Sequence, residues 1–381
     1  MRTINLFIAG YGNVGKALVA MIQKQHKYLS DKEGVELNVV GICNSSVMVF
    51  DTDGLTEEQI EGALVRSKTD EVAAKEMGDK RSEEKASERK VSEGNAAEES
   101  RSRPQLFIEE IIRLSLQRSI FVDCTADRQI SMLYKQILSD KIGIVTCNKI
   151  ANTLDMQYYR DIRSAARRGC VPFLYETNAG AALPVISLIK QIIRSGDTIK
   201  KIEATLSGSL NYLFNTYNGT ESFASIVEFE RESGYLEPDP RTDLNGIDLL
   251  RKALILAREI GIEIEAEDVE ISRFLPQECL DGGVEEFFDS LEKNEPYFRS
   301  LYKSTEDRGE KLAYCILIEN GKAEVALKSI AREHPFYPLR GTDNAIIVTT
   351  GFYSEGIRVM GAGAGGEQTA SGILNDILTT I

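Results

Sequence analysis

The first 170 residues alternate between short apolar runs and stretches with helical periodicity. Apolar runs of strand length occupy residues 4–9, 35–43, 120–124 and 142–147. Apolar residues at helical spacing follow three of them, at Ala17, Leu18, Met21 and Ile22, at residues 130–138, and at residues 156–166. Strands that alternate with helices are typical of a parallel, doubly wound α/β sheet.

The pattern changes near Val171. Strands are predicted at residues 171–175, 199–205, 312–319, 322–329 and 345–350, and helices at 183–194, 223–233 and 246–260. The chain ends in a glycine-rich turn and a final helix. We therefore expect a parallel-sheet domain at residues 1–152, a second α+β domain with a mixed sheet at 153–350, and a segment at 351–381 that returns to the first domain.

Residues 66–103 interrupt the first domain with a charged stretch. Roughly half of these residues are Glu, Asp, Lys or Arg, and the larger apolar ones are Val72, Met77 and Val91. Such a segment buries too little apolar surface to offset the entropy of ordering it. It is predicted to be a disordered or loosely helical surface insertion.

The composition of the chain argues against several classes of function. The net charge of −14 argues against a nucleic-acid partner. No apolar run reaches the roughly 18 residues of a membrane span, no signal peptide is apparent, and the six cysteines are scattered, so we expect a cytoplasmic protein with reduced thiols. With only His26 and His334 present, an acid or base for catalysis is expected among Lys, Asp, Glu and Tyr.

Gly10, Gly12 and Gly15 form a G-x-G-x-x-G motif between the first strand and the first helix. In this context the first glycine permits a tight turn, the second lets a pyrophosphate approach the backbone, and the third allows close helix–strand packing. The motif predicts a Rossmann-type domain that binds NAD or NADP. Glycines that serve packing alone remain the alternative.

The end of the second strand is expected to lie near the adenine ribose. It reads Cys43-Asn44-Ser45-Ser46, without the carboxylate typical of NAD-specific folds and without an arginine for a 2′-phosphate. This favours use of both cofactors or a preference for NADP. The alternative is that these residues only form a turn.

A second motif spans residues 234–252, GYLEPDPRTDLNGIDLLRK. Pro238 and Pro240 predict an extended stretch, and a helix is expected after Asp243. Asp248 and Lys252 are four residues apart and are predicted to project away from that helix's apolar stripe. They form either a solvated ion pair or part of an active site in which a lysine transfers a proton and carboxylates hold an ammonium group.

This motif matches the homoserine dehydrogenase pattern G-Y-x-E-P-D-P-R-x-D-L-x-G-x-D-x-x-R-K at every specified position. The chain resembles that family over nearly its whole length apart from the charged stretch, most of all the dehydrogenase half of bifunctional aspartokinase–homoserine dehydrogenases. Neither a kinase nor a regulatory segment is recognised, so we expect a free-standing enzyme or an excised half. Supporting segments are Val122-Asp-Cys-Thr125, Asn148-Lys149, Tyr175-Glu-Thr-Asn178, Leu183-Pro-Val-Ile186 and Ser207-Gly-Ser-Leu-Asn-Tyr212.

The resemblance implies NAD(P)-dependent interconversion of L-homoserine and L-aspartate 4-semialdehyde, in threonine, methionine and isoleucine biosynthesis. Lys252 would be the catalytic proton donor and acceptor, assisted by Lys149. Glu237 and Asp248 would hold the substrate, with Asp243 in support. Besides the glycine motif and Lys149, the implied cofactor contacts are Asn13, Val14, Thr125, Gly234 and Gly365.

The resemblance also implies a homodimer formed through the second domain's sheet, and a sodium or potassium site. The matching cation-site positions are Glu176, Ala179, Ala181 and Leu183. Here the chain departs from the family: Ala179 replaces a usual Val and Ala182 a usual Gly, which strains the loop if the glycine conformation is required. Cys147 replaces a usual Pro, with little effect expected.

Other enzyme classes and a non-catalytic class are the alternatives. Tyr28 and Lys32 match the Tyr-x-x-x-Lys of short-chain dehydrogenases by letter, but they precede the second strand. An aspartate-semialdehyde dehydrogenase would need a cysteine with a histidine partner, and both histidines lie in unsuitable contexts. A nucleotide-sensing module would keep the glycines and lose Lys252 or Glu237, which are both present.

Overall fold

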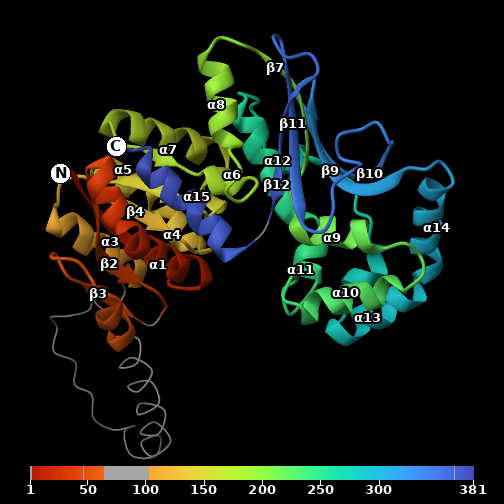
Figure 1. Cartoon of the computed structure of the whole chain (residues 1–381), viewed down its shortest axis with the longest axis horizontal. Coiled ribbons are helices and arrows are strands. Elements are labelled where there is room, and N and C mark those ends of the chain that lie inside the picture. Colours follow the sequence, from red (N-terminus) through yellow and green to blue (C-terminus); the bar gives the residue numbers. More distant parts are fainter. Residues whose placement is uncertain (1, 46, 64–102, 364) are drawn as a thin grey trace, which may run out of the picture. The chain divides into compact units, whose positions relative to one another are not determined.

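The computed structural model describes residues 2–45, 47–63, 103–363 and 365–381. The chain forms two compact units (Figure 1), each described here by itself. The first consists of Met1–Ala151, Arg160–Leu174 and Ile373–Ile381, and the second of Asn152–Tyr159 and Tyr175–Gly372. Of the charged stretch at residues 66–103, only Arg103 lies within the described residues.

The first unit contains a six-stranded sheet in the order β3-β2-β1-β4-β5-β6. All neighbouring strands are parallel except the short β3, which runs antiparallel to β2. The strands are β1 (Arg2–Ala9), β2 (Val35–Cys43), β3 (Met48–Phe50), β4 (Ser119–Asp123), β5 (Gly143–Thr146) and β6 (Phe173–Leu174). The predicted parallel sheet is confirmed, and its near-continuous burial is what helices on both faces produce.

Helices connect these strands. They are α1 (Asn13–Tyr28) with a π-helical turn at Leu29–Glu33, α3 (Arg103–Leu114), α4 (Arg128–Met132), α5 (Tyr134–Ser139), α6 (Ile150–Thr153) and α7 (Met156–Gly169). A chain of aromatic rings lies in the core between them, from Phe50 through Phe107 and Phe121 to Tyr134, with successive centroids 5.0 to 6.5 Å apart.

The second unit contains a six-stranded mixed sheet in the order β12-β11-β7-β9-β10-β8, antiparallel except for the β8–β10 pair. Its strands are β7 (Ile199–Thr205), β8 (Glu270–Ile271), β9 (Lys311–Glu319), β10 (Lys322–Ile330), β11 (Asp343–Thr350) and β12 (Ile357–Ala362). The fold class predicted from the sequence, a parallel α/β sheet plus an α+β part with a mixed sheet, is confirmed.

Helices of the second unit pack on this sheet and beside it (Figure 1). They are α8 (Ile186–Arg194), α9 (Gly208–Thr216), α10 (Phe223–Glu232), α11 (Arg241–Leu244), α12 (Ile247–Glu259), α13 (Val284–Lys293) and α14 (Glu295–Glu306). The last helix, α15 (Gly366–Leu378), begins in the second unit and ends in the first. Among the described residues, no helix is both long and apolar enough to cross a membrane.

Candidate active site

The glycine motif forms a tight turn from β1 into α1. Gly10 has φ +92°, and a Cβ there would lie 2.8 Å from the carbonyl oxygen of Cys124. A Cβ on Gly15 would lie 2.1 Å from the carbonyl oxygen of Gly10, so these two glycines are required by packing. A Cβ on Gly12 would meet nothing within 4 Å. Packing therefore explains two of the three glycines and leaves Gly12 open for a ligand.

The N-terminus of α1 suits an anion. No side chain caps this end, and its first turn contains no acidic residue. Gly12 and Asn13 are exposed and Val14 is half-buried. The first backbone N–H groups of a helix have no partner within the helix, and together with the helix dipole they favour a phosphate. The residues present therefore fit the pyrophosphate of a dinucleotide.

A buried carboxyl group fixes the ends of β4 and β5. Asp123 is fully buried and accepts hydrogen bonds from the Tyr134 hydroxyl (2.7 Å), the Asn148 amide (3.0 Å) and Thr125, through both its N–H (2.8 Å) and its hydroxyl (2.7 Å). Burial raises the pKa of Asp123, and these hydrogen bonds oppose that rise. The network fixes the backbone at Asn148, directly before the half-buried Lys149. It also holds Thr125 beside Gly10.

The end of β2 is a hydrogen-bonded turn. The side chain of Asn44 accepts from the N–H of Val47 at 2.6 Å, and the N–H of Asn44 donates to the carbonyl of Val47 at 2.9 Å. Asn44 thus helps connect β2 to β3. Ser45 is exposed.

In the second unit, residues 234–252 form a braced loop followed by α12. The Arg241 guanidinium bonds both oxygens of Asp239, at 2.9 and 2.7 Å, and the carbonyl of Gly282 at 2.6 Å. This ion pair holds the pKa of Asp239 below its usual value. The helix predicted at residues 246–260 is α12, which starts at Ile247; before it, the short α11 ends at Leu244 and Gly246 takes φ +78°. The two prolines and this ion pair hold the loop in place.

Three predicted substrate carboxylates gather in this loop and the first turn of α12. Asp243 accepts a hydrogen bond from the N–H of Glu237 at 2.9 Å. Burial raises the pKa of Asp243, and the charges of Glu237 and Asp248 add to the rise. Glu237 itself is exposed, and its carboxylate has no hydrogen-bond or ion-pair partner in the described part of the chain. Asp243 is placed to position Glu237, whose carboxylate remains open to a cation.

Lys252 is buried, and the prediction that it projects from the exposed side of α12 was wrong. Its ammonium donates to the carbonyl of Leu206 at 2.5 Å and pairs with Asp248 at 2.7 Å. The reason is that α12 packs against β9, β10 and α8, so most of its circumference is covered. The Asp248 side chain is 39% exposed. The solvated ion pair, the simpler reading of the spacing, therefore does not describe this lysine.

Glu176, the predicted cation ligand, caps a helix. Its Oε1 accepts from the N–H groups of Val185 (2.6 Å) and Ile186 (2.7 Å), and its Oε2 accepts from Ser187 (2.8 Å), at the N-terminus of α8. These bonds explain a buried carboxylate without a cation. The glycine conformation that would strain Ala182 is not required there, because the left-handed residues of this loop are Gly180 (φ +86°) and Ala181 (φ +55°). Ala179 is extended, and Leu183 donates its N–H to Gly180.

Replacement of Glu176 tests the capping role. Glu176→Ala leaves three buried N–H groups without their acceptor, so we expect a loss of about 2 kcal/mol in the free energy of unfolding. Urea denaturation in sodium chloride and in potassium chloride measures it. The loss should be equal in the two salts, and a loss that depends on the cation would contradict the capping account.

The remaining predicted cofactor glycines lie in the second unit. Gly234 follows α10 with φ +76° and is exposed, and Gly365 precedes α15 with φ +134°. The structure thus brings the glycine motif, Thr125 and Lys149 together in the first unit. It brings Glu237, Asp243, Asp248 and Lys252 together in the second.

Comparison with known proteins decides the family. The family model described as Homoserine dehydrogenase matches residues 184–378, and the model described as Homoserine dehydrogenase, NAD binding domain, matches residues 10–176. The homoserine dehydrogenase of Schizosaccharomyces pombe is 31% identical over 98% of this chain and 94% of its own length. The chain belongs to the homoserine dehydrogenase family. The predicted family and a nicotinamide dinucleotide as cofactor are both confirmed, and the short-chain alternative is excluded.

Other relatives differ in length. The bifunctional aspartokinase/homoserine dehydrogenase of Haemophilus influenzae is 33% identical over the whole chain, which spans 43% of that protein. The chain thus spans about two fifths of such bifunctional relatives. Among solved structures, a Candida auris protein of unknown function has TM-score 0.79 and 28% identity, with 100% of this chain and 98% of that one covered. A hyperthermophilic archaeal homoserine dehydrogenase in complex with NADPH, at TM-score 0.70 and 23% identity over 99% of this chain and 97% of its own, has the same fold.

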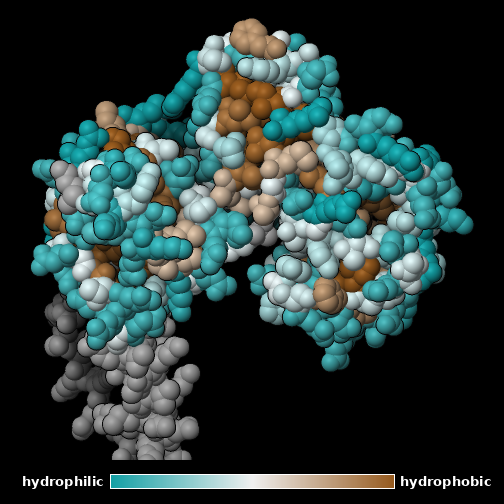
Figure 2. Space-filling view, viewed as in Figure 1, coloured by the Kyte–Doolittle hydropathy of each residue, from teal (hydrophilic) through white to brown (hydrophobic). Residues whose placement is uncertain are grey.

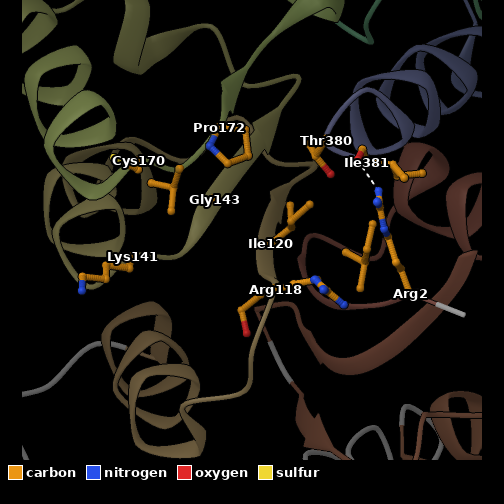
Figure 3. Close-up of a pocket in the computed structure, with 12 residues that line it drawn as sticks. Arg2, Arg118, Ile120, Lys141, Gly143, Cys170, Pro172, Thr380 and Ile381 are labelled. Carbon is orange, nitrogen blue, oxygen red and sulfur yellow. Dashed lines mark hydrogen bonds between the residues drawn. The ribbon is translucent and has the colours of Figure 1, made fainter.

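A cavity of about 390 Å³ in the first unit is lined by none of the predicted site residues (Figure 3). Its lining includes Arg2, Arg118, Lys141 and Pro172, which stand at or just before the starts of β1, β4, β5 and β6. Ligands of parallel sheets bind at the opposite edge, where the strands end. This cavity is therefore not the cofactor site.

Sequence reasoning missed two buried acids of this chain. Asp123 lies within a segment that supports the family resemblance, but it was given no role. Glu230 of α10 is fully buried, and neither of its carboxylate oxygens has a hydrogen-bond partner among the described residues. Its helical spacing from Phe223, Ile226 and Val227 placed it on the apolar face, which was the available signal.

Proposed function

We propose that this chain catalyses the NAD(P)-dependent interconversion of L-homoserine and L-aspartate 4-semialdehyde, the reaction of threonine, methionine and isoleucine biosynthesis. The observation that carries the proposal is the buried Lys252, held by Asp248 and the Leu206 carbonyl within a segment that matches the family's motif throughout. A solvated surface lysine would not be expected to act on a substrate. A lysine with fixed hydrogen-bond acceptors is oriented for proton transfer.

The cofactor supplies hydride transfer when it is bound. For this chain we assign its pyrophosphate to the N-terminus of α1, with Gly10, Gly12, Asn13, Val14 and Gly15 around it. Thr125, Lys149, Gly234 and Gly365 complete the proposed contacts. The NADPH that accompanies the archaeal homoserine dehydrogenase of the same fold supports this choice of ligand.

We assign substrate recognition to the acidic residues of the second unit. Homoserine and aspartate semialdehyde both carry an ammonium group, and the exposed, unpartnered carboxylate of Glu237 is suited to bind it. Asp243 holds the backbone of Glu237 in place. Asp248 contributes negative charge beside Lys252.

Proton transfer falls to Lys252, with Lys149 in support. Reduction of the aldehyde places negative charge on its oxygen, and a lysine ammonium can neutralise that charge by donating a proton. Asp248 and the Leu206 carbonyl both accept from the Lys252 ammonium, which fixes the orientation of this group for proton transfer. In the oxidation direction, the neutral amine takes the proton of the homoserine hydroxyl.

Replacement of Glu237 isolates substrate binding. In Glu237→Gln the amide cannot neutralise the substrate's ammonium group, so KM for homoserine should rise about 10- to 100-fold while kcat changes less. Steady-state kinetics at saturating NADP measure this. Glu232→Gln, at an exposed position of α10, is the control. An unchanged kcat/KM in Glu237→Gln would assign Glu237 a structural role.

Cofactor preference is predicted to respond to Ser45, where β2 ends without a carboxylate. We expect wild type to turn over with both NAD and NADP. Ser45→Asp should repel a 2′-phosphate and lower the NADP-to-NAD ratio of kcat/KM about tenfold. Ser304→Asp, at an exposed position of α14 that is assigned no cofactor contact, is the control. An unaltered ratio would place the ribose elsewhere.

The domain roles and the assembly are part of the proposal. Dinucleotide binding is assigned to the first unit, residues 1–151, 160–174 and 373–381, and substrate binding and dimerisation to the second unit, residues 152–159 and 175–372, so the predicted bounds 1–152, 153–350 and 351–381 shift accordingly. Hydrophobic surface gathers over α8, β7 and β11 of the second unit (Figure 2). Phe352 and Tyr353, which follow β11, are 75% and 55% exposed, and Met360 in β12 is 44% exposed. Such a patch supports a homodimer formed through this sheet. Light scattering of the purified chain should give twice the mass of one chain.

The sodium or potassium site at Glu176, Ala179, Ala181 and Leu183 stays a prediction. The proposed proton transfer does not use it, and the Glu176 carboxylate accepts hydrogen bonds from the backbone at the start of α8. Catalysis is assigned to the lysines and carboxylates alone. Equal kcat/KM in sodium and in potassium buffers is the expected result.

The test of the proposal is L-homoserine-dependent reduction of NADP or NAD, followed by nicotinamide absorbance. D-homoserine and L-serine serve as controls for stereochemistry and chain length. Turnover with L-homoserine alone supports the proposal. Cofactor binding without turnover would instead favour a nucleotide-binding module.

A further inference from the structure

The ends of β4 and β5 also carry a pair of cysteines that the proposed reaction does not use. Cys124 follows Asp123 and Cys147 follows Thr146, and Asp123 and Thr146 are paired residues of the two parallel strands. The N–H of Cys147 donates to the Asp123 carbonyl at 3.0 Å, so the pairing continues beyond the strands. Neighbouring strands lie about 4.8 Å apart and paired residues point to the same face, a separation compatible with a disulfide.

The two thiols differ in acidity because they interact directly. Interaction with the neighbouring Cys124 thiol lowers the pKa of Cys147, and the charge of Lys149 adds to the fall, whereas burial and the charge of Asp123 oppose it. Interaction with the Cys147 thiol and burial raise the pKa of Cys124 well above its usual value, and the charge of Asp123 adds to the rise. Thiol–disulfide exchange begins with a thiolate, and a second thiol nearby completes it. Both cysteines are half-buried, whereas Cys43, Cys279 and Cys315 are buried.

This pair lies beside the proposed cofactor contacts. The carbonyl oxygen of Cys124 packs closely against Gly10: a Cβ added to Gly10 would lie 2.8 Å from this oxygen. Cys147 is followed directly by Asn148, whose side chain bonds Asp123 and the Asp127 carbonyl, and then by Lys149. A covalent bond between the two cysteines therefore constrains the Cys124 backbone that packs against Gly10. It also constrains the backbone of Cys147, two residues before Lys149. Cys147 is also a position where the chain departs from the family pattern.

We propose that Cys124 and Cys147 are a reversible redox site, and that their oxidation to a disulfide by a low-molecular-weight disulfide lowers turnover. The Cys147 thiolate attacks one sulfur of the oxidant, the oxidant's S–S bond breaks, and one small thiol leaves. Cys124 then loses its proton, its sulfur attacks Cys147, and the second small thiol leaves. Two protein thiols lose two electrons and two protons, which reduce the oxidant to two thiols.

The experiment equilibrates the full chain in glutathione buffers of increasing disulfide content. Mass spectrometry of a non-reduced digest follows the cross-link, and kinetics and NADPH fluorescence follow function. We expect a Cys124–Cys147 cross-link, a fall of at least tenfold in kcat/KM with the same midpoint, and recovery in dithiothreitol. Cys147→Ser should remain active in oxidising buffer, and Cys124→Ser should form a mixed disulfide on Cys147 but no internal cross-link. Cys170→Ser, which removes an exposed cysteine elsewhere in the first unit, should behave like wild type.

Each outcome decides the matter. Absence of the cross-link under conditions that convert Cys170 to a mixed disulfide would overturn the redox site. A cross-link without loss of turnover and without weaker NADPH binding would overturn its effect on function. The effect on turnover rests on the proposed function, but the cross-link does not. If the reduced enzyme fails to oxidise homoserine, the proposed function fails while the cross-link and NADPH binding still test the pair.

Discussion

Lys252→Ala should lower kcat by about 10³-fold while the dissociation constant for NADPH changes less than threefold. General acid–base catalysis by a positioned side chain typically contributes 10²- to 10⁴-fold, and Lys252 is the buried ammonium with fixed acceptors in Asp248 and Leu206. The lysine is proposed to act on the reacting oxygen, so binding of the cofactor in the first unit should persist. Steady-state kinetics and NADPH fluorescence titration measure the two quantities.

Arg251→Ala is the matched control for this prediction. Arg251 precedes Lys252 in α12 and is exposed, so the change removes one cation from the same helix without touching the proposed site. It should retain kcat within about twofold. Circular dichroism should show that both variants are folded. Activity of Lys252→Ala within tenfold of wild type would contradict the assignment of proton transfer to Lys252.

Glu230 should make the protein less stable as pH rises from about 5 to about 8. Its carboxyl is buried in α10 without a hydrogen-bond partner in the described residues. Burial, with a smaller contribution from Asp243, raises the pKa of Glu230 to about 8. Between its unfolded pKa and this value, the folded state holds one proton more than the unfolded state. Stability therefore falls through this window, by an amount on the order of 3–5 kcal/mol, and no further above it.

Glu230→Gln tests this pH dependence because an amide has no proton to lose. The free energy of unfolding in urea, measured at pH 5.5, 7 and 8.5, should decline more steeply in wild type than in the variant. The test is the slope of the unfolding free energy against pH. The glutamine amide is also buried without a partner, so it changes the stability equally at every pH and contributes nothing to this slope. Glu232→Gln, at an exposed position of the same helix, should follow wild type. Parallel curves for wild type and Glu230→Gln would contradict a raised pKa.

The strands at the centres of the two sheets were predictable because buried strands consist of continuous runs of apolar residues. The predicted ranges 35–43 and 199–205 coincide with β2 and β7. The short β3 and the edge strand β12 were missed. β3 has three residues, and β12 alternates between exposed and half-buried positions without an apolar run. Helix α9 was also missed, since its sequence GSLNYLFNT mixes polar and apolar residues and its start depends on a cap by Ser207.

The sequence was enough to predict which residues form the candidate site, but not which contacts their side chains make. The pairing of Asp248 with Lys252 follows from helical spacing, yet the burial of Lys252 depends on strands β9 and β10, which lie about 60 residues further along the chain. Likewise, the capping role of Glu176 was not predicted, because its partners are backbone N–H groups at the start of α8, which carry no sequence signature. Tertiary packing decides both cases.

The most direct test of the central claim is to identify the product of the reverse reaction. The purified chain is mixed with NADPH and L-aspartate 4-semialdehyde, and the amino acids formed are separated and weighed by mass spectrometry. We predict that L-homoserine appears in a 1:1 ratio with the NADPH oxidised, and that Lys252→Ala forms it at least 100-fold more slowly. Oxidation of NADPH without L-homoserine, or no reaction by a folded protein that binds NADPH, would contradict the proposed function.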